Sequence, residues 1–419
     1  MLRNGMGNVM DTMRRTLWIL ALTASSLLMP TANGQQRAAH TNPLNQEPLV
    51  RVALEHLHEL DYDGAVERFE EVRRQHAGDP EATALLLDAT LFRELYRLDL
   101  LDTTFYANDG FLTGKHPTPE DPQARDRIFS LADEAVSEAD KRLQANPRDV
   151  DALFARGFAR SLKAVYLAMV ERGFMPGMHL AIQAKDDCKD VLEMDPEYVD
   201  AKLVYGVYEY VVGALPWGFK VMIGFFGITG SKDKGLALLR DDGNRGSVTS
   251  VEAQTAIALF LRREAKYSEA IGIVHQLVER YPHNFLFSLE EANLRKDAGE
   301  GMRAVYGYQS LLLQAAKPGY FYEPHLDLAY FGLGDSLRGQ RHFGEAAAAY
   351  ENAAFSPTAG AELKRRSLVA AGMCRDLSGE RKEAMRDYQM AIDLGADSTQ
   401  SDLARQYLRK PYKEKQPGN

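Results

Sequence analysis

The chain has 419 residues, of which 45% are hydrophobic, so it holds enough apolar side chains for an extensive core. A single globular core stops growing at about 250–300 residues, so a chain of this length forms several domains or an array of repeats. The formal net charge of −9 argues against nucleic acid as a partner and against a protein that lies on a membrane surface through basic residues.

Residues 1–34 have the features of a secretory signal peptide. Arg14 and Arg15 precede an apolar run over residues 17–28, and small residues then precede a cleavage site after Gly34. The run is shorter than the roughly 20 residues of a transmembrane helix, although an uncleaved anchor stays open as an alternative. We therefore expect an exported protein of the periplasm or cell envelope, with a flexible lead-in over residues 35–46.

Residues 47–250 carry a helical pattern of apolar residues that is irregular, because two insertions interrupt it. The insertions span residues 100–123 and 213–235. Long insertions in a compact fold are usually functional or disordered. Three aromatic residues within the first insertion predict that it packs against another surface.

Regular repeats occupy residues 251–409, and the clearest of them lies between residues 330 and 357. Its pattern consists of Tyr330, Leu333, Gly334, Leu337, Phe343, Ala346, Tyr350, Ala353 and Pro357. This resembles the tetratricopeptide pattern W-x2-L-G-x2-Y…A-x3-F…P, in which two antiparallel helices form one repeat. The small Ala346 lets the two helices approach closely, and Pro357 ends the second helix.

The small residue of the second helix can be followed along the chain. Its positions are Ala65, Ala135, Ala184, Gly235, Ala270, Ala304, Ala346 and Ala384. From Gly235 onward these positions are 34 to 42 residues apart, close to the tetratricopeptide period. The sequence therefore predicts an all-α, tetratricopeptide-type, right-handed superhelical solenoid of about eight helix pairs. A capping helix over residues 401–408 and a polar tail over residues 410–419 complete it.

The two cysteines, Cys188 and Cys374, are about five repeats apart in this register, too far for a disulfide. Cys188 takes the core position where a repeat usually places Phe or Tyr. We expect two buried free thiols, although an exported protein is also compatible with a disulfide.

The second insertion combines an apolar segment with a glycine-rich element. Pro216, Lys220 and several glycines make residues 215–226 a poor transmembrane helix, while Ser231 is a suitable N-cap for the helix that follows. We expect the apolar segment to fold back across this helix, with Gly235 as the contact point for its backbone.

The glycine-rich element is Gly227-Ile-Thr-Gly230-Ser-Lys-Asp233-Lys-Gly235-Leu-Ala-Leu-Leu. It is similar to the Gly-Phe-x-Gly-Asp-Arg-x-x-Gly-Leu-x-x-Leu signature of the tetratricopeptide repeat protein 39 and inclusion-body-clearance family, and of its bacterial exported relatives. The resemblance covers about 15 to 25 residues and departs where this chain has Ser231 and Lys232 in place of the Asp-Arg pair. It implies an all-helical scaffold without catalysis, in which Gly227, Gly230, Asp233 and Gly235 form a structural motif.

Three patterns that could carry chemistry lack the setting that the chemistry needs. Residues 230–232 are glycine-rich but do not follow the order of a phosphate-binding loop. Ser336 is expected in the middle of a helix, whereas a nucleophilic serine needs a turn and a base. His56 and His58 are two apart on a helix, so they face different ways. We predict no enzyme, no metal and no cofactor.

We predict a protein–protein interaction scaffold or adapter that holds a peptide or partner loop in its concave face, which the first helix of each pair lines. The groove positions of pairs five to seven are Glu252, Leu259, Arg262, Asn293, Lys296, Asp335 and Arg338. These residues could instead be ordinary solvated positions. Two other functions stay open, namely a membrane- or lipid-associated factor that inserts residues 215–226, and an enzyme with a site in residues 100–123.

Overall fold

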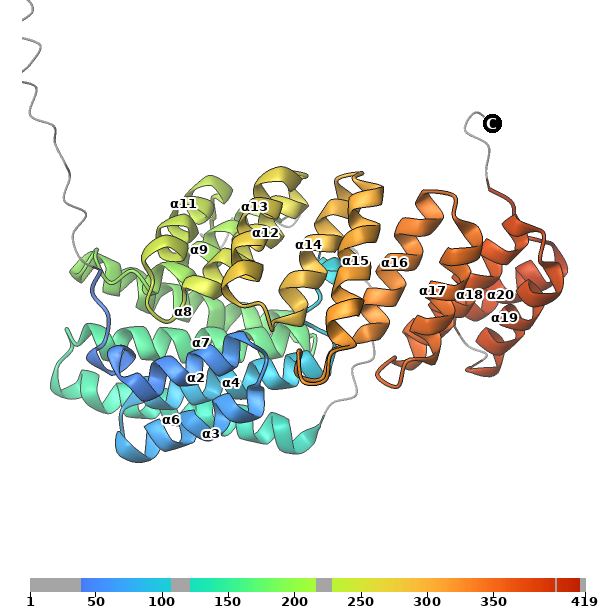
Figure 1. Ribbon diagram of the computed structural model, residues 1–419. Coiled ribbons are helices and arrows are strands. Elements are labelled where there is room, and N and C mark those ends of the chain that lie inside the picture. Colours follow the sequence, from blue (N-terminus) through green and yellow to red (C-terminus); the bar gives the residue numbers. More distant parts are fainter. Residues whose placement is uncertain (1–38, 107–120, 216–227, 396–397, 415–419) are drawn as a thin grey trace, which may run out of the picture. The chain divides into compact units, whose positions relative to one another are not determined.

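The computed structural model describes residues 39–106, 121–215, 228–395 and 398–414 (Figure 1). In these residues the regular structure is helical, apart from one isolated bridge between His40 and Tyr198. The predicted all-α solenoid of tetratricopeptide-type helix pairs is confirmed.

Eight helix pairs follow one another along the described chain. Pairs one to four are α2 (Pro48–His58) with α3 (Tyr62–Gln75), α4 (Pro80–Arg97) with α6 (Pro122–Ala145), α7 (Val150–Met169) with α8 (Phe174–Met194), and α9 (Ala201–Ala214) with α11 (Lys232–Arg245). Pairs five to eight are α12 (Ser250–Arg263) with α13 (Tyr267–Arg280), α14 (Phe285–Asp297) with α15 (Gly301–Ala315), α16 (Leu326–Gly339) with α17 (Phe343–Phe355), and α18 (Ala361–Ser378) with α19 (Arg381–Asp393). The helix α20 (Thr399–Arg409) caps the array, and short 3-10 helices lie at η1 (Pro43–Gln46) and η2 (Thr103–Tyr106).

The sequence next to each helix explains where several of them begin. Asp79 and Asp121 cap α4 and α6 with their side chains, and each is followed by a proline, which lacks the N–H that a first helical turn leaves unpaired. Ser231 caps α11 as predicted, because its hydroxyl oxygen accepts a hydrogen bond from the Lys234 N–H at 3.3 Å.

Neighbouring helices approach closely where a glycine faces a tyrosine ring. A methyl group on Gly334 would lie 2.7 Å from the ring of Tyr350, and one on Gly372 would lie 2.6 Å from the ring of Tyr388. Both tyrosines are fully buried, and their hydroxyls donate to carboxylates on the first helix of the same pair. The small and large residues of the repeat pattern therefore fit against one another across the pair.

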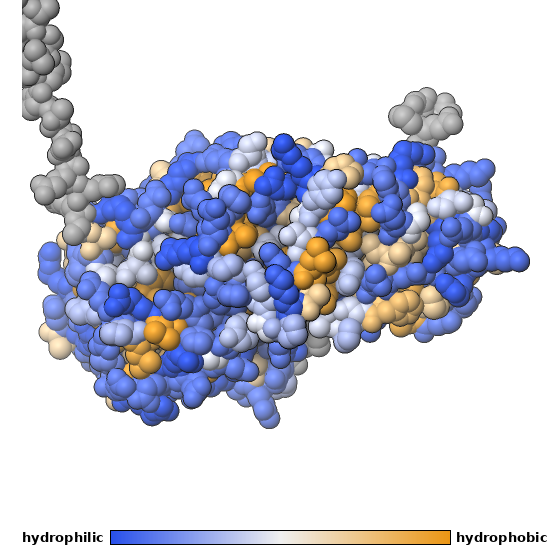
Figure 2. Space-filling model, viewed as in Figure 1, coloured by the Kyte–Doolittle hydropathy of each residue, from blue (hydrophilic) through white to orange (hydrophobic). Residues whose placement is uncertain are grey.

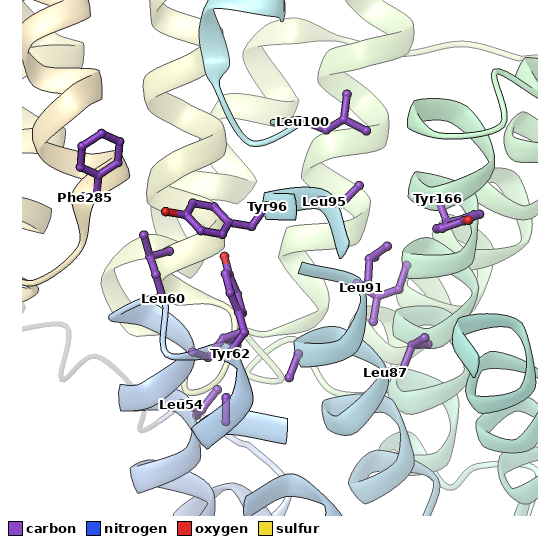
Figure 3. Packing of buried hydrophobic residues seen from close by; sticks show 14 of the residues in the cluster. Leu54, Leu60, Tyr62, Leu87, Leu91, Leu95, Tyr96, Leu100, Tyr166 and Phe285 are labelled. Carbon is purple, nitrogen blue, oxygen red and sulfur yellow. The ribbon is translucent and has the colours of Figure 1, made fainter. Parts of the chain in front are cut away.

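The first two pairs contact pairs five to seven, which the repeat pattern did not predict. Figure 3 shows Leu60 and Tyr62 near Tyr96, on the side that faces Phe285 of α14. Two hydrogen bonds join the same regions: Asn284 Nδ2 donates to the His58 carbonyl at 2.6 Å, and the Tyr96 hydroxyl donates to the Glu323 carbonyl at 2.9 Å.

The expectation of a flexible lead-in is wrong for residues 40–46. Asn42 and Asn45 are buried, and their side-chain amides each donate to the carboxyl of Glu81 at 2.6 Å. Burial raises the pKa of Glu81 well above its usual range, although the two amides oppose this change. The segment is ordered because it supplies hydrogen-bond donors to a carboxyl group that would otherwise be buried without partners.

Candidate functional site

The seven residues predicted to line the groove lie on the first helices of three successive pairs, α12, α14 and α16. They fall into two groups. Those on α12, together with Asn293, contact other parts of the chain or are buried among its helices. Lys296, Asp335 and Arg338 are half-buried and lie toward the later repeats.

Arg262 belongs to the covered group and is only 4% exposed. Its guanidinium donates to Asp297 at 2.6 and 2.8 Å, to Glu290 at 3.1 Å and to the Thr103 hydroxyl at 2.7 Å. The Thr103 hydroxyl in turn lies within hydrogen-bond distance of the Glu290 carboxylate. Arg262 therefore holds the start of the 100–123 insertion against α12 and α14, and it does not offer its charge to a partner.

The electrostatics of this network depend on how deeply it is buried. Burial raises the pKa of Glu290 to about 7, although the positive charge of Arg262 and the hydrogen bond from Thr103 both oppose the change. Burial lowers the pKa of Arg262, but the charges of Glu290 and Asp297 reverse the effect and raise it. The pattern-based prediction missed Glu290 and Thr103, and the only signal in the sequence was the expectation that the insertion packs on another surface. Its described start does so, while residues 107–120 lie outside the described chain.

The remaining members of the covered group are also held within the chain. Glu252 pairs with His58 Nε2 at 3.0 Å, across the contact between α2 and α12. Asn293 is 4% exposed, and its side-chain oxygen accepts a hydrogen bond from the Tyr308 hydroxyl at 2.5 Å. Leu259 packs against the apolar cluster of pairs four and five. The prediction that Arg262 and Asn293 are open to a partner or to solvent is therefore wrong, because other segments of the chain cover both side chains.

The open group consists of Lys296, Asp335 and Arg338, on the first helices of pairs six and seven. Lys296 Nζ lies 3.7 Å from Asp335, which also accepts the Tyr350 hydroxyl at 2.6 Å. Arg338 donates to the Tyr412 hydroxyl at 3.0 Å, and among the described residues no carboxylate lies within ion-pair distance of it. A half-buried guanidinium without a carboxylate partner can bind an acceptor group of another molecule.

The segment 410–414 already lies on this open group. The Tyr412 backbone N–H donates to Asp376 on α18 at 2.7 Å, and Glu414 pairs with Arg341 just beyond α16 at 2.8 Å. The predicted polar tail is therefore placed, over these residues, on the surface predicted to bind a partner.

The glycine-rich element forms a tight contact within pair four. A methyl group on Gly230 would lie 2.7 Å from the Glu209 carbonyl oxygen, and one on Gly235 would lie 2.6 Å from both the Gly206 carbonyl oxygen and the Tyr210 nitrogen. Gly235 contacts another backbone, that of α9. The expected contact with the apolar segment falls on residues outside the described chain. Asp233 lies in the first turn of α11 and is exposed. Gly227 and nearly all of residues 215–226 lie outside the described chain.

The residues considered from the sequence for catalytic or metal-binding roles are bound to other residues of the fold. His56 pairs with Asp61 at 2.6 Å, and the Ser336 hydroxyl donates to the Gly332 carbonyl within α16 at 3.0 Å. No cluster of three or more His, Cys, Asp or Glu side chains in the described ranges is arranged to hold a metal ion.

The described surface offers neither a reactive thiol nor a span for a membrane. Both cysteines are free and buried, as predicted, and burial raises the pKa of each, that of Cys374 to about 11. None of the described helices has the length and apolar character needed to cross a membrane. Hydrophilic residues cover most of the face drawn in Figure 2, with small hydrophobic groups between them.

The comparisons with known proteins found matches only among solved structures. No protein-family model and no curated protein matches the chain, so the resemblance to the tetratricopeptide repeat protein 39 family stays a prediction. A tetratricopeptide repeat protein from Parabacteroides merdae is 14% identical, with 79% of this chain and 99% of that chain covered and a TM-score of 0.34. Yeast Tom70 is 12% identical, with 86% of this chain and 87% of that chain covered and a TM-score of 0.34. The human IFIT1 dimer with m7Gppp-AAAA is 11% identical, with 89% of this chain and 84% of that chain covered and a TM-score of 0.40. These scores are too low for the likeness to say anything about function.

Proposed function

We propose that the chain is an exported, non-catalytic protein–protein interaction scaffold or adapter of the cell envelope. It binds an extended peptide or loop of a partner protein along α16 and α18, the first helices of pairs seven and eight. The observation that carries this proposal is Arg338, a half-buried guanidinium at a predicted groove position that has no carboxylate partner among the described residues.

The location follows from the contrast with pairs five and six. There the groove position of α12 is closed, because Arg262 is bound to Glu290, Asp297 and Thr103. A partner would have to break that buried network before it could reach Arg262 on α12 or Glu290 on α14. On α16 a partner has to displace only the segment 410–414 and no buried ion pair, because Lys296, Asp335 and Arg338 keep part of their surface exposed.

The chemistry of the open group suits a peptide. It combines positive charges that bind carboxylates or hydroxyls with carboxylates that accept backbone N–H groups. Asp376 already accepts one such N–H, from Tyr412, at 2.7 Å. The net charge of −9 argues against nucleic acid, and residues 1–34 support export.

The test is site-specific photocrosslinking in the native envelope. Gly339, next to Arg338, and Gly272, on the second helix of pair five, both lie where an added side chain meets open space. A photoreactive residue at position 339 should give discrete adducts that disappear with Arg338→Ala, while the same residue at position 272 should give none of them. Adducts that are equal at the two positions, or that survive Arg338→Ala, would contradict the proposed site.

Export has a separate test. Mass spectrometry of the mature protein should find Gln35 at the N-terminus, because the leader is expected to be cut after Gly34. A protein that retains Met1 or Met13 in the cytoplasm would contradict export without affecting the binding site.

A further inference from the structure

The segment 410–414 leaves the capping helix and turns back over the earlier repeats. The last helical hydrogen bond of α20 joins the Lys410 N–H to the Gln406 carbonyl at 3.0 Å. Beyond it, Tyr412 contacts α18 through Asp376, and Glu414 contacts Arg341 at the end of α16. The segment therefore crosses the first helices of pairs eight and seven, where a partner peptide is proposed to bind.

Tyr412 is the anchor of this segment. Its ring packs edge-on against Tyr407, with centroids 5.3 Å apart and planes at 80°, and the Arg338 guanidinium lies 5.5 Å from the ring centroid. Its hydroxyl accepts from Arg338 at 3.0 Å. Aromatic edge contacts and cation–π contacts both favour a tyrosine ring at this place.

The backbone of Tyr412 is held by a carboxylate that other residues keep in position. Asp376 has a side chain that is 1% exposed, and it accepts from Arg381 at 2.9 Å and from the Tyr388 hydroxyl at 2.9 Å. The Tyr412 N–H is its third donor, at 2.7 Å. Asp376 is therefore oriented by residues that stay in place whether or not a peptide is bound.

The residues on either side of Tyr412 are held weakly. Lys410, Pro411, Lys413 and Glu414 are exposed, and the ion pair between Arg341 and Glu414 joins side chains that are 69% and 39% exposed. Exposed ion pairs of this kind contribute little to stability. The segment is thus held mainly through one half-buried residue, Tyr412, as a displaceable ligand would be.

We propose that the segment 410–414 is an internal competitor for the α16–α18 groove, and that the partner is an extended peptide of the same chemistry. Such a peptide carries a tyrosine that contacts Tyr407 and Arg338, and an acidic residue two positions later that contacts Arg341. The inference rests on the proposed function and adds to it a sequence preference and an autoinhibitory contact.

The test measures binding of a labelled synthetic peptide with the sequence Lys-Pro-Tyr-Lys-Glu-Lys, which copies residues 410–415, to the full chain. When the chain's own segment fills the site, an added peptide can bind only those molecules in which the site is open. The apparent affinity for the peptide therefore falls in proportion to the fraction of open molecules. Tyr412→Ala, which empties the site, should therefore bind the peptide about 3- to 5-fold more tightly than the parent. The matched control Lys413→Ala, an exposed residue of the same segment, should bind like the parent.

Two further variants connect the binding to the groove. Adding Arg338→Ala to Tyr412→Ala should remove the gain, and a peptide with alanine in place of its tyrosine should not bind. Circular dichroism and thermal unfolding of each variant show whether it is folded. Tyr412→Phe, which keeps the ring and loses only the hydroxyl, should fall between the parent and Tyr412→Ala.

Several outcomes would overturn the proposal. Equal affinity of the parent and Tyr412→Ala would mean that the segment does not compete, and a gain that survives Arg338→Ala would place the peptide elsewhere. A dimer in sedimentation that Tyr412→Ala dissociates would assign the segment to a second copy of the chain. Absence of peptide binding together with Arg338-dependent adducts at position 339 would remove this inference and leave the proposed function standing.

Discussion

The predicted groove positions of the regular repeats form a closed half and an open half, and the same position differs sharply between them. Arg262 in pair five is 4% exposed and bound to two carboxylates, whereas Arg338 in pair seven is half-buried and bound to a tyrosine hydroxyl. Both arginines are the thirteenth residue of the first helix of their pair. The difference shows that a position within a repeat predicts which side a residue faces, while distant parts of the chain decide whether that side is open.

The largest effect that can test this comparison is expected for Arg262→Ala. The variant would leave Glu290 and Asp297 without their cation in a buried site, and breaking one partner of such a pair typically costs about 3–5 kcal/mol. The matched variant Arg338→Ala should lower the free energy of unfolding by about 1 kcal/mol or less, because it breaks no ion pair in the described chain. Urea unfolding of both proteins measures the contrast.

Equal losses in the two variants would show that the halves are not different in kind. The result also bears on any binding experiment. Arg262→Ala is expected to weaken capture of a partner by destabilising the fold, so Arg338→Ala is the appropriate variant for a loss of binding alone.

The second prediction uses the pH dependence of the closed half. The pKa of Glu290 rises from its ordinary value of 4.5 to about 7, so the folded state binds a proton that the unfolded state releases between these values. The stability that this proton contributes is complete below pH 4.5 and is lost as the pH rises through 7. Over that range the loss is roughly 3 kcal/mol, because each pH unit between the two pKa values corresponds to about 1.4 kcal/mol.

Glu290→Gln should remove this loss, because glutamine resembles the protonated carboxyl. The free energy of unfolding of Glu290→Gln minus that of the parent should therefore rise between about pH 4.5 and pH 8. Unfolding curves at several pH values measure it, with the exposed Glu279→Gln as the control. A difference that stays constant across this range would contradict the buried position of Glu290 in the closed half.

The third prediction concerns the spacing of helices in the irregular repeats. A methyl group on Gly235 would meet the α9 backbone at 2.6 Å, whereas one on Gly272 of α13 would meet nothing within 4 Å. Gly235→Ala should therefore lower the free energy of unfolding by about 1–3 kcal/mol. Gly272→Ala should raise it by roughly 0.5–1 kcal/mol, since alanine favours the helix. A stabilised Gly235→Ala protein would mean that α9 and α11 can separate without loss.

The helix pairs could be predicted because the information for them is local. Gly334, Ala346 and Tyr350 lie within one repeat, and their sizes alone specify how its two helices fit. The closed half could not be predicted in this way. Thr103 and Glu290 are 187 residues apart, and each is an unremarkable polar residue in its own segment.

The candidate site was predicted in part for the same reason. The repeat position predicts that Arg338 lines the groove, but nothing in the polar, unpatterned sequence around Tyr412 indicates that this tyrosine returns to that arginine. Gly235 shows an intermediate case. The need for a small residue at this position was predicted, whereas the close approach of α9, the other helix of the same pair, was not.

The smallest expected effect comes from a comparison of two segments that contact the predicted groove positions, the start of the 100–123 insertion and residues 410–414. Thr103→Ala would remove the hydroxyl that Arg262 and Glu290 share in a buried network, at a cost of about 1–3 kcal/mol. Tyr412→Ala would remove a half-buried ring between exposed neighbours, and we expect a loss of about 1 kcal/mol or less. Urea unfolding of the two variants beside the parent gives both values. The two losses in the free energy of unfolding should differ because the segments have different roles. The fold requires the first segment, whereas the second occupies a binding site and can leave without unfolding its surroundings. If Tyr412→Ala cost as much as Thr103→Ala, the segment 410–414 would be part of the folded array, and the open half would be closed as well.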